Sequence, residues 1–269
     1  MRPRTRCFTI GLFTGVVTCG SSELALAEHC ELHELTVAPL SSYQVSVGWE
    51  AARYRNSRYE GQFEGTSVAM GFRYAGFLIT GKVPAYRLVR NGLPVEGLGD
   101  ATLAVEQRVF SSADGHNALG GRMALSIPTG AQSQDLGMGH SMVMPGLWAR
   151  FQWQRLHGHL GLDFARAMGT TDSQHGGHNM SYFPIVQPMN MSEIAATGLL
   201  ELEMLGKMAI RTRLVSARPV ASGNGTPRSI VVLGVGFTGE ALSTYLEWQT
   251  PIEGTPFQSR MMGGLTISF

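Results

Sequence analysis

The sequence predicts an all-β protein, an antiparallel transmembrane β-barrel of the outer-membrane type with about twelve strands. Three observations predict this fold. Apolar and polar residues alternate with a period of two through most of the chain after residue 40. The links between the alternating segments are short and long in turn. One such segment reaches Phe269, with Leu265 and Ile267 on the same face and Thr266 and Ser268 on the other.

Residues 1–27 are expected to be an export signal that is cleaved from the mature protein. Three arginines form a basic start, and an uncharged apolar run of about 13 residues follows from Cys7 to Cys19, too short to span a bilayer as a helix. Ala25-Leu26-Ala27 then offers a small-x-small cleavage site. Two alternatives stay open, namely lipid attachment at Cys19 and a buried N-terminal helix.

Cleavage would leave residues 28–40 as a short periplasmic segment and residues 41–269 as the barrel. It would remove three arginines and one glutamate, so the formal net charge would change from +1 to −1. This balance gives no electrostatic reason to expect nucleic acid as a partner. Only Cys30 of the three cysteines would remain, so no intramolecular disulfide is expected.

The expected strands are each about ten residues long or slightly longer, which is the length that a tilted strand needs to cross the hydrocarbon layer. In chain order they cover residues 41–53, 64–75, 77–89, 99–110, 117–127, 145–156, 157–168, 193–204, 206–217, 229–239, 241–250 and 260–269.

In most of these segments, the alternation predicts one apolar face that points outward. In chain order, these outward residues are Tyr43, Val45, Val47 and Trp49; Val68, Met70, Phe72 and Tyr74; Ala101, Leu103, Val105 and Val109; Leu147, Ala149, Phe151 and Trp153; Leu160, Leu162 and Phe164; Leu200 and Leu202; Met208, Ile210 and Leu214; and Leu242, Leu246 and Trp248.

The connections sort by length, as they do in outer-membrane barrels. Tight turns are expected near residues 75–76, 157–158, 205–206 and 239–240, with a modest link at 111–116. Longer loops are expected at 54–63, 90–98, 128–144, 169–192, 218–228 and 251–259. A soluble sandwich has no reason to sort its loops in this way, so the short turns are assigned to the periplasm and the long loops to the outside.

Aromatic residues cluster beside the expected periplasmic ends, where a girdle at the membrane interface belongs. They are Tyr74, Phe77, Phe151, Trp153, Phe237 and Phe269. In lipid only a closed barrel satisfies the strand backbone, so the last strand must pair with the first, near Tyr43 to Trp49. A terminal Phe269 also resembles the end signal read by bacterial barrel-assembly machinery. The expected partners are therefore outer-membrane lipid, that machinery and a small solute.

Two stretches resemble an outer-membrane transporter family named for the MetA-type protein of phenol-degradation pathways. They are "GLGDATLAVEQRVF" and "ALSIPTG", and together they cover about a quarter of the chain. The motif residues are Gly97, Gly99 and Asp100, then Pro128, Thr129 and Gly130. The resemblance implies a barrel that passes hydrophobic or aromatic compounds. Physically, the glycines allow a tight approach into a strand, and the proline ends a strand at a loop.

Charged residues of both signs fall on the inward face of the expected strands, and these are the candidate lumen residues. They are Glu50, Arg73, Lys82, Glu106, Arg108, Arg150, Asp163, Glu201, Glu203, Lys207, Arg211, Arg213 and Glu247, together with Asp100 in its loop. Cross-strand ion pairs are expected between Glu201 or Glu203 and Lys207 or Arg211. Two interpretations stay open: a hydrated, constricted passage, and a barrel filled by an ion-pair network.

Two of the long loops combine histidine with methionine, the ligand types that suit soft copper and silver ions. The stretches are "GMGHSMVMPG", with Met138, His140, Met142 and Met144, and "HGGHNMSYFPIVQPMNM". In the second, His175, His178 and Met180 are a candidate contact site at the extracellular mouth. Flexible filler is the competing explanation for the methionines. No cofactor is expected.

No nucleophile elbow, zinc-protease helix or phosphate-binding glycine loop is found, so no catalytic residues are assigned. A lipid-acting hydrolase would need a serine and a histidine together near the outer rim. His157 and His159 are expected inward near the periplasmic side, whereas His178 and Ser181 share a loop without an orienting partner. We expect passive passage of small, hydrophobic or aromatic solutes, with a hydrolase and an adhesive barrel as the alternatives.

Overall fold

The computed structural model describes residues 41–55, 60–168, 189–204, 207–220, 225–239, 241–255 and 257–269, and most of them lie in strands. The expected signal peptide, residues 1–27, and the segment 28–40 lie outside this part of the chain. The strands are β1 (Ser41–Arg55), β2 (Glu60–Tyr74), β3 (Phe77–Arg90), β4 (Leu93–Leu98), β5 (Ala101–Ser111), β6 (Asn117–Ile127), β7 (Ser141–Trp153), β8 (Leu156–Met168), β9 (Ser192–Glu203), β10 (Met208–Pro219), β11 (Arg228–Thr238), β12 (Leu242–Glu253) and β13 (Phe257–Ser268). A single 3₁₀ turn, η1, spans Gln132–Gln134 in the described residues, where no helix has the length and hydropathy of a membrane span.

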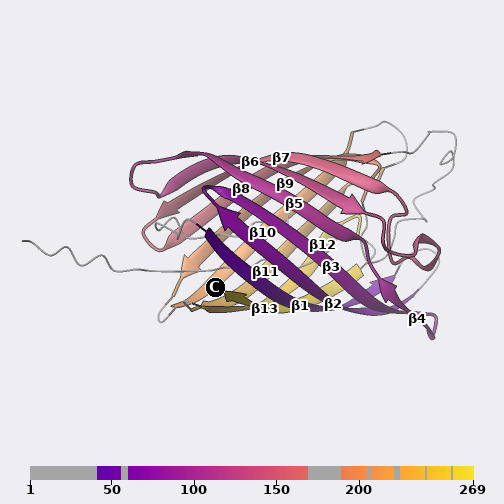
Figure 1. Ribbon diagram of the computed structural model, residues 1–269. Coiled ribbons are helices and arrows are strands. Elements are labelled where there is room, and N and C mark those ends of the chain that lie inside the picture. Colours follow the sequence, from indigo (N-terminus) through magenta and orange to yellow (C-terminus); the bar gives the residue numbers. More distant parts are fainter. Residues whose placement is uncertain are drawn as a thin grey trace, which may run out of the picture.

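The strands form one antiparallel sheet that closes on itself (Figure 1). Each strand pairs with its neighbours in the chain, except that β4 and β5 both pair with β3 and not with each other. The last strand, β13, pairs with β1 in a register that sets Val47 opposite Leu265. The chain end is fastened by two backbone hydrogen bonds, from the N–H of Tyr43 to the C=O of Phe269 (3.3 Å) and from the N–H of Phe269 to the C=O of Tyr43 (2.9 Å). The expected pairing of the last strand with the first is confirmed, and no sheet edge is left along this seam.

Residues 90–98 do not form the expected loop. They turn tightly at Asn91 and Gly92, both with positive φ, and return as β4 along one half of β3. The other half of β3 pairs with β5. β4 and β5 therefore occupy one strand position between them, and the barrel has twelve strands around its circumference. "LPVEGL" is too short and too rich in glycine and proline to show a strand pattern by itself.

Two of the other expected long loops are also shorter than their sequences suggest. β1 ends at Arg55 and β2 begins at Glu60. Likewise, β12 ends at Glu253 and β13 begins at Phe257. Polar residues break the alternation there, but cross-strand pairing includes Arg55 with Glu60, Tyr54 with Phe257 and Ser229 with Glu253. We call the barrel end that holds Phe269 and the tight turns the turn end, and the opposite end the loop end.

The two faces of the wall differ as the alternation predicts. On β13, Leu265 and Ile267 are each 39% exposed on the outside, whereas Thr266 between them is 1% exposed on the inside. The same contrast runs around the barrel. Of the expected girdle, Tyr74, Phe77, Trp153, Phe237 and Phe269 are exposed at the turn end, and Phe151 is half-buried there. The outer face is thus an apolar band with an aromatic rim, as lipid requires.

Candidate functional site in the barrel lumen

Many of the charged side chains that line the lumen are almost completely buried and paired with opposite charges. The most extensive network joins β9, β10 and β12 in the halves of these strands nearer the turn end. The Glu247 carboxylate accepts hydrogen bonds from Arg213 (2.9 Å to Nη2) and Arg211 (3.4 Å to Nη1). Arg211 also lies 3.6 Å from Glu201, its register partner on β9. Gly236 on β11 leaves room for this arginine, because a side chain there would collide with its guanidinium.

Two further buried ion pairs join strands on the inner face of the barrel. Arg122 on β6 forms a bidentate hydrogen-bonded pair with Asp163 on β8, and a side chain at Gly146 on the intervening strand would collide with that carboxylate. Arg260 on β13 donates to Glu50 on β1, across the seam where the barrel closes. Because an unpaired charge is costly in such surroundings, this pairing lets a narrow lumen keep its charges.

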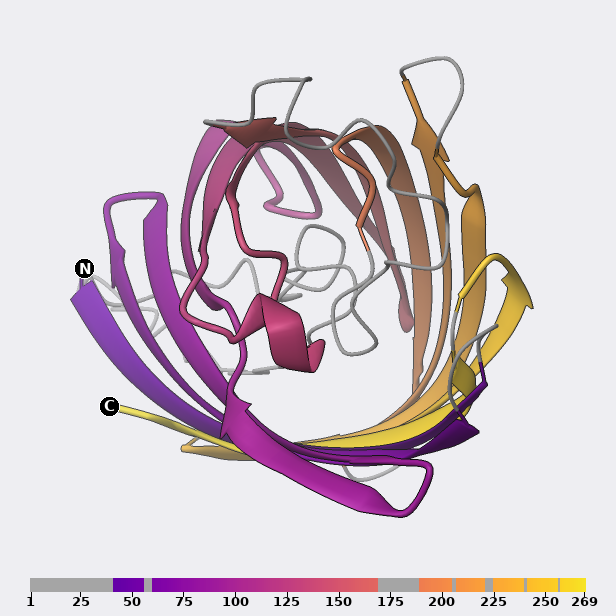
Figure 2. The same ribbon diagram turned by 90° about the vertical axis from the view of Figure 1, so that its right-hand side faces the viewer.

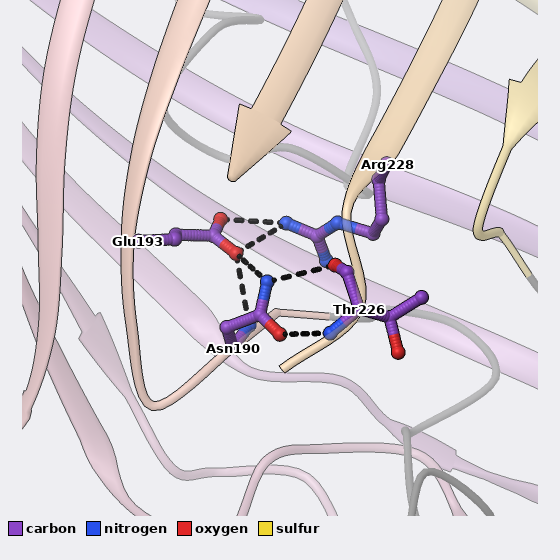
Figure 3. Close-up of polar contacts among 4 residues, drawn as sticks. All are labelled: Asn190, Glu193, Thr226 and Arg228. Atoms are coloured by element: carbon purple, nitrogen blue, oxygen red, sulfur yellow. Dashed lines mark hydrogen bonds and ion pairs between the residues drawn. The ribbon is translucent and has the colours of Figure 1, made fainter. Parts of the chain in front are cut away.

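A further cluster, of polar and charged side chains, lies at the loop end and is drawn in Figure 3. The Glu193 carboxylate accepts from Arg228 (2.6 and 2.7 Å) and from both the backbone N–H and the side-chain amide of Asn190 (2.9 and 2.7 Å). Asn190 also donates to the C=O of Thr226 (3.1 Å) and accepts from its N–H (2.9 Å). The cluster ties the segment before β9 to the segment before β11, so it fixes both at the rim.

Three arginines of the lumen also lie over aromatic rings. The guanidinium carbon is 4.7 Å from the ring centroid for Arg150 over Trp148, and 5.9 Å both for Arg211 over Tyr245 and for Arg260 over Phe63. The inner surface therefore offers cationic planes and aromatic faces side by side.

The motif residues dock the loop at 128–140 into the loop end of the lumen, and we call this segment the inward loop. Asp100, which is fully buried, accepts the backbone N–H groups of Gly130 (3.0 Å) and Met138 (2.6 Å). Burial raises the pKa of the Asp100 carboxyl, and these two hydrogen bonds oppose the shift. Thr129 donates to the C=O of Gly99 (2.6 Å). Residues of the first motif, Gly99 and Asp100, thus bind residues of the second, Thr129 and Gly130.

The docked loop fills part of the barrel opening, where η1 is visible in Figure 2. Its Leu136 is fully buried against inward-facing residues of several strands, including Leu88. Gly97 on β4 leaves space for it, because a side chain there would reach the Leu136 methyl group. The opposite side of the loop is held by Arg90, which donates to Asp135 (2.7 Å).

The structure places the candidate lumen residues in three groups. The buried, inward-facing members are Glu50, Glu106, Asp163, Glu201, Arg211, Arg213 and Glu247, and Asp100 is buried at the inward loop. Arg73, Lys82 and Arg150 face inward and are half-buried. Arg108, Glu203 and Lys207 are exposed at the turn end. The expected pair between strands is present for Glu201 with Arg211, whereas Glu203 lies 3.7 Å from His157.

Four buried, charged residues of the lumen are not among the candidates predicted from the sequence: Arg122, Glu193, Arg228 and Arg260. The alternation would have identified three of them, since Arg122, Glu193 and Arg260 stand at inward positions of their strands. Arg228 lies one residue before its expected strand.

The candidate metal ligands His175, His178 and Met180 lie outside the residues that the structure describes, as does Ser181. In the described part of the chain, no three His, Cys, Asp or Glu side chains gather as a metal site would require. His159 is buried in the lumen and stacks with Trp148 at 6.4 Å between ring centroids.

Comparison with known proteins gives a likeness in fold only. No family model matches the chain, and no curated protein sequence matches it. Among solved structures, the KdgM porin in complex with disordered oligogalacturonate is 11% identical, with a TM-score of 0.53, and the match covers 84% of this chain and 99% of that one. The NanC porin is 10% identical, with a TM-score of 0.53 and coverage of 84% and 98%.

The translocator domain of the autotransporter NalP from Neisseria meningitidis is similar as well, with 11% identity, a TM-score of 0.55 and coverage of 87% and 89%. At such low identity these matches carry no information about a solute or a partner. Together with the closed sheet and the apolar outer face, they show that the chain has the fold of a twelve-stranded outer-membrane β-barrel.

Proposed function

We propose that this protein is an outer-membrane channel that lets small solutes, aromatic ones among them, cross by passive diffusion through a narrow lumen. The observation that carries the proposal is the chemistry of the inner face. Charges of both signs are held in pairs across the middle of the barrel, for example Arg122 with Asp163 and Arg213 with Glu247. A barrel whose interior only had to be filled could use apolar side chains, which avoid the desolvation cost of buried ions.

Paired charges favour a passage with little preference for the sign of the solute. Each arginine in these pairs has a carboxylate within contact distance, so the fields largely cancel along the path. Selectivity then depends on size and on the contacts a solute makes with the wall.

The arginine–aromatic stacks support aromatic solutes. Of these stacks, the one of Arg150 over Trp148 has a half-buried guanidinium that can reach a solute. When the side chains around Trp148 move, a planar ring can lie against the indole while Arg150 binds the hydroxyl or carboxylate of the solute. The resemblance of the Asp100 and Thr129 motifs to a transporter family associated with phenol degradation supports the same solute class.

The passage is narrow. Most inward-facing side chains of the described strands are buried, and the inward loop occupies part of the mouth (Figure 2). Passage of a solute therefore requires side chains or the inward loop to move, and we expect low conductance.

Residues 1–27 would direct export, and Phe269, exposed at the turn end, would be accessible to barrel-assembly machinery. With the turn end in the periplasm, the inward loop would face the outside of the cell.

The proposal is tested by swelling of proteoliposomes that contain the refolded barrel. Phenol and benzoate should enter faster than neutral sugars of similar mass. Replacing Trp148 with Leu should reduce the preference for aromatic solutes, whereas Trp153→Leu, on the lipid-facing side of the same strand, should not. Entry of sugars and aromatic solutes at the rate of empty liposomes would contradict the proposal.

A further inference from the structure

A group of methionines is buried inside the loop end of the barrel, and we call it the methionine cluster. It contains Met138, Met142, Met144 and Met189, packed with Ala104, Ala124 and Ala165. Three segments supply the methionines: the inward loop, β7 and the residues just before β9. Methionines that are about 50 positions apart in the sequence, at 138–144 and at 189, thus pack together in one cluster.

The composition of this cluster differs from that of the other buried cluster in the lumen. In the latter, which also contains alanines, every large side chain is branched or aromatic, as in Leu88, Ile230 and Phe257. In the methionine cluster every large side chain is a thioether, and its remaining buried members are alanines. The need to fill the barrel interior with apolar side chains therefore does not by itself explain why this cluster contains methionine.

Thioethers are soft, uncharged ligands that prefer Cu(I) and Ag(I) over hard or strongly hydrated ions. Methionine side chains are flexible enough to bring several sulfur atoms toward one ion. A buried, uncharged ligand set favours a monovalent ion, because the cost of taking an ion out of water rises steeply with its charge. The Asp100 carboxyl group, which accepts the N–H of Met138, lies beside the cluster.

We propose that the methionine cluster binds one monovalent soft metal ion, Cu(I) or Ag(I), inside the loop end of the lumen. Binding does not depend on solute passage, so this proposal and the channel function can fail separately. The site differs from the loop candidate His175, His178 and Met180, since its ligands come from the barrel wall and the inward loop.

The test is a calorimetric titration of the full refolded barrel in detergent with Ag(I) in chloride-free buffer. It is repeated with Cu(I) in competition with a chromophoric chelator under ascorbate. The critical variant is Met142→Leu with Met144→Leu, which removes two sulfur atoms at nearly constant side-chain volume. The control is Met70→Leu with Met123→Leu, two methionines that are 64% and 49% exposed on the outer face.

The wild type and the control should bind one ion with the same affinity. The lumen variant should bind at least about tenfold more weakly, a loss that even outer-shell changes cause at metal sites. Met189→Leu, from a different segment, should weaken binding in the same direction if the double variant does not fold. Wild-type affinity in both lumen variants, no binding to the wild type at micromolar ion, or loss of binding only in His175→Ala with His178→Ala would each overturn the proposal.

Discussion

Replacing Asp100 with alanine should release the inward loop from the barrel mouth. The carboxylate is fully buried and accepts two backbone N–H groups, those of Gly130 and Met138. Each buried N–H that loses its acceptor costs about 1–3 kcal/mol. Water can reach part of an opened loop, so we expect docking to weaken by about 2–4 kcal/mol, which is roughly 30- to 700-fold in the docking equilibrium.

Hydrogen exchange followed by mass spectrometry measures this release directly. Amides of the segment 128–140 should exchange faster in Asp100→Ala by a factor within that range, while strands of the barrel wall keep their protection. Asp114→Ala is a matched control, because Asp114 also accepts two hydrogen bonds, from Ser112 and from the N–H of His116, but in an exposed turn at the opposite end. Wild-type exchange of the inward loop in Asp100→Ala would refute the reasoning.

The same contact should depend on pH. Burial raises the pKa of Asp100 above its ordinary value, so the docked state favours the protonated carboxyl. The resulting contribution to docking is fully present below the unfolded pKa of about 3.9 and is lost as the pH rises through the higher docked-state pKa. Exchange of the inward loop, corrected for the intrinsic pH dependence of exchange, should therefore be slower in mildly acidic than in neutral buffer, and the difference should vanish in Asp100→Ala.

Two further predictions separate the inside of the wall from the outside. Glu193→Gln leaves Arg228 without its buried counter-charge and should lower the stability of the barrel by about 3–5 kcal/mol. Glu253→Gln, in an exposed pair, should cost about 1 kcal/mol or less, as read from the temperature at which the folded band is lost on gels. Leu214→Arg, at the middle of β10 on the outer face, should cost about 2–4 kcal/mol in vesicles, and Met208→Arg at the turn end about 0–1 kcal/mol. Equal, small effects of both arginines in refolding titrations would argue that this face does not contact lipid.

The alternation of residues was sufficient to predict the barrel and its two faces, because a wall with lipid on one side constrains every second residue. The strand ends could not be predicted in the same way. Within 54–63 and 251–259 polar side chains interrupt the pattern, yet strand pairing continues as far as Arg55 and Glu253 and begins again at Glu60 and Phe257. β4 could not be predicted because it pairs with β3 through backbone hydrogen bonds, and its six residues are too few to show an alternating pattern.

Placement of the lumen charges follows from the alternation, but their partners do not. Arg260 pairs with Glu50 only because the barrel closes, and the two are 210 residues apart. The docking of the inward loop by Asp100 likewise joins positions 30 and 38 residues apart through a bend that no periodicity encodes. Met138, Met142 and Met144 stand in a stretch that combines histidine with methionine, but their meeting with Met189 inside the barrel depends on the same closure.

The most direct test of the channel proposal is the conductance of the purified barrel in planar lipid bilayers. We predict small, discrete steps with weak ion selectivity, which become larger in Asp100→Ala because the inward loop then leaves the mouth. Membranes that contain verified, folded barrels but stay silent for both the wild type and Asp100→Ala would contradict the account. That result would identify the paired charges as the filling of a closed barrel.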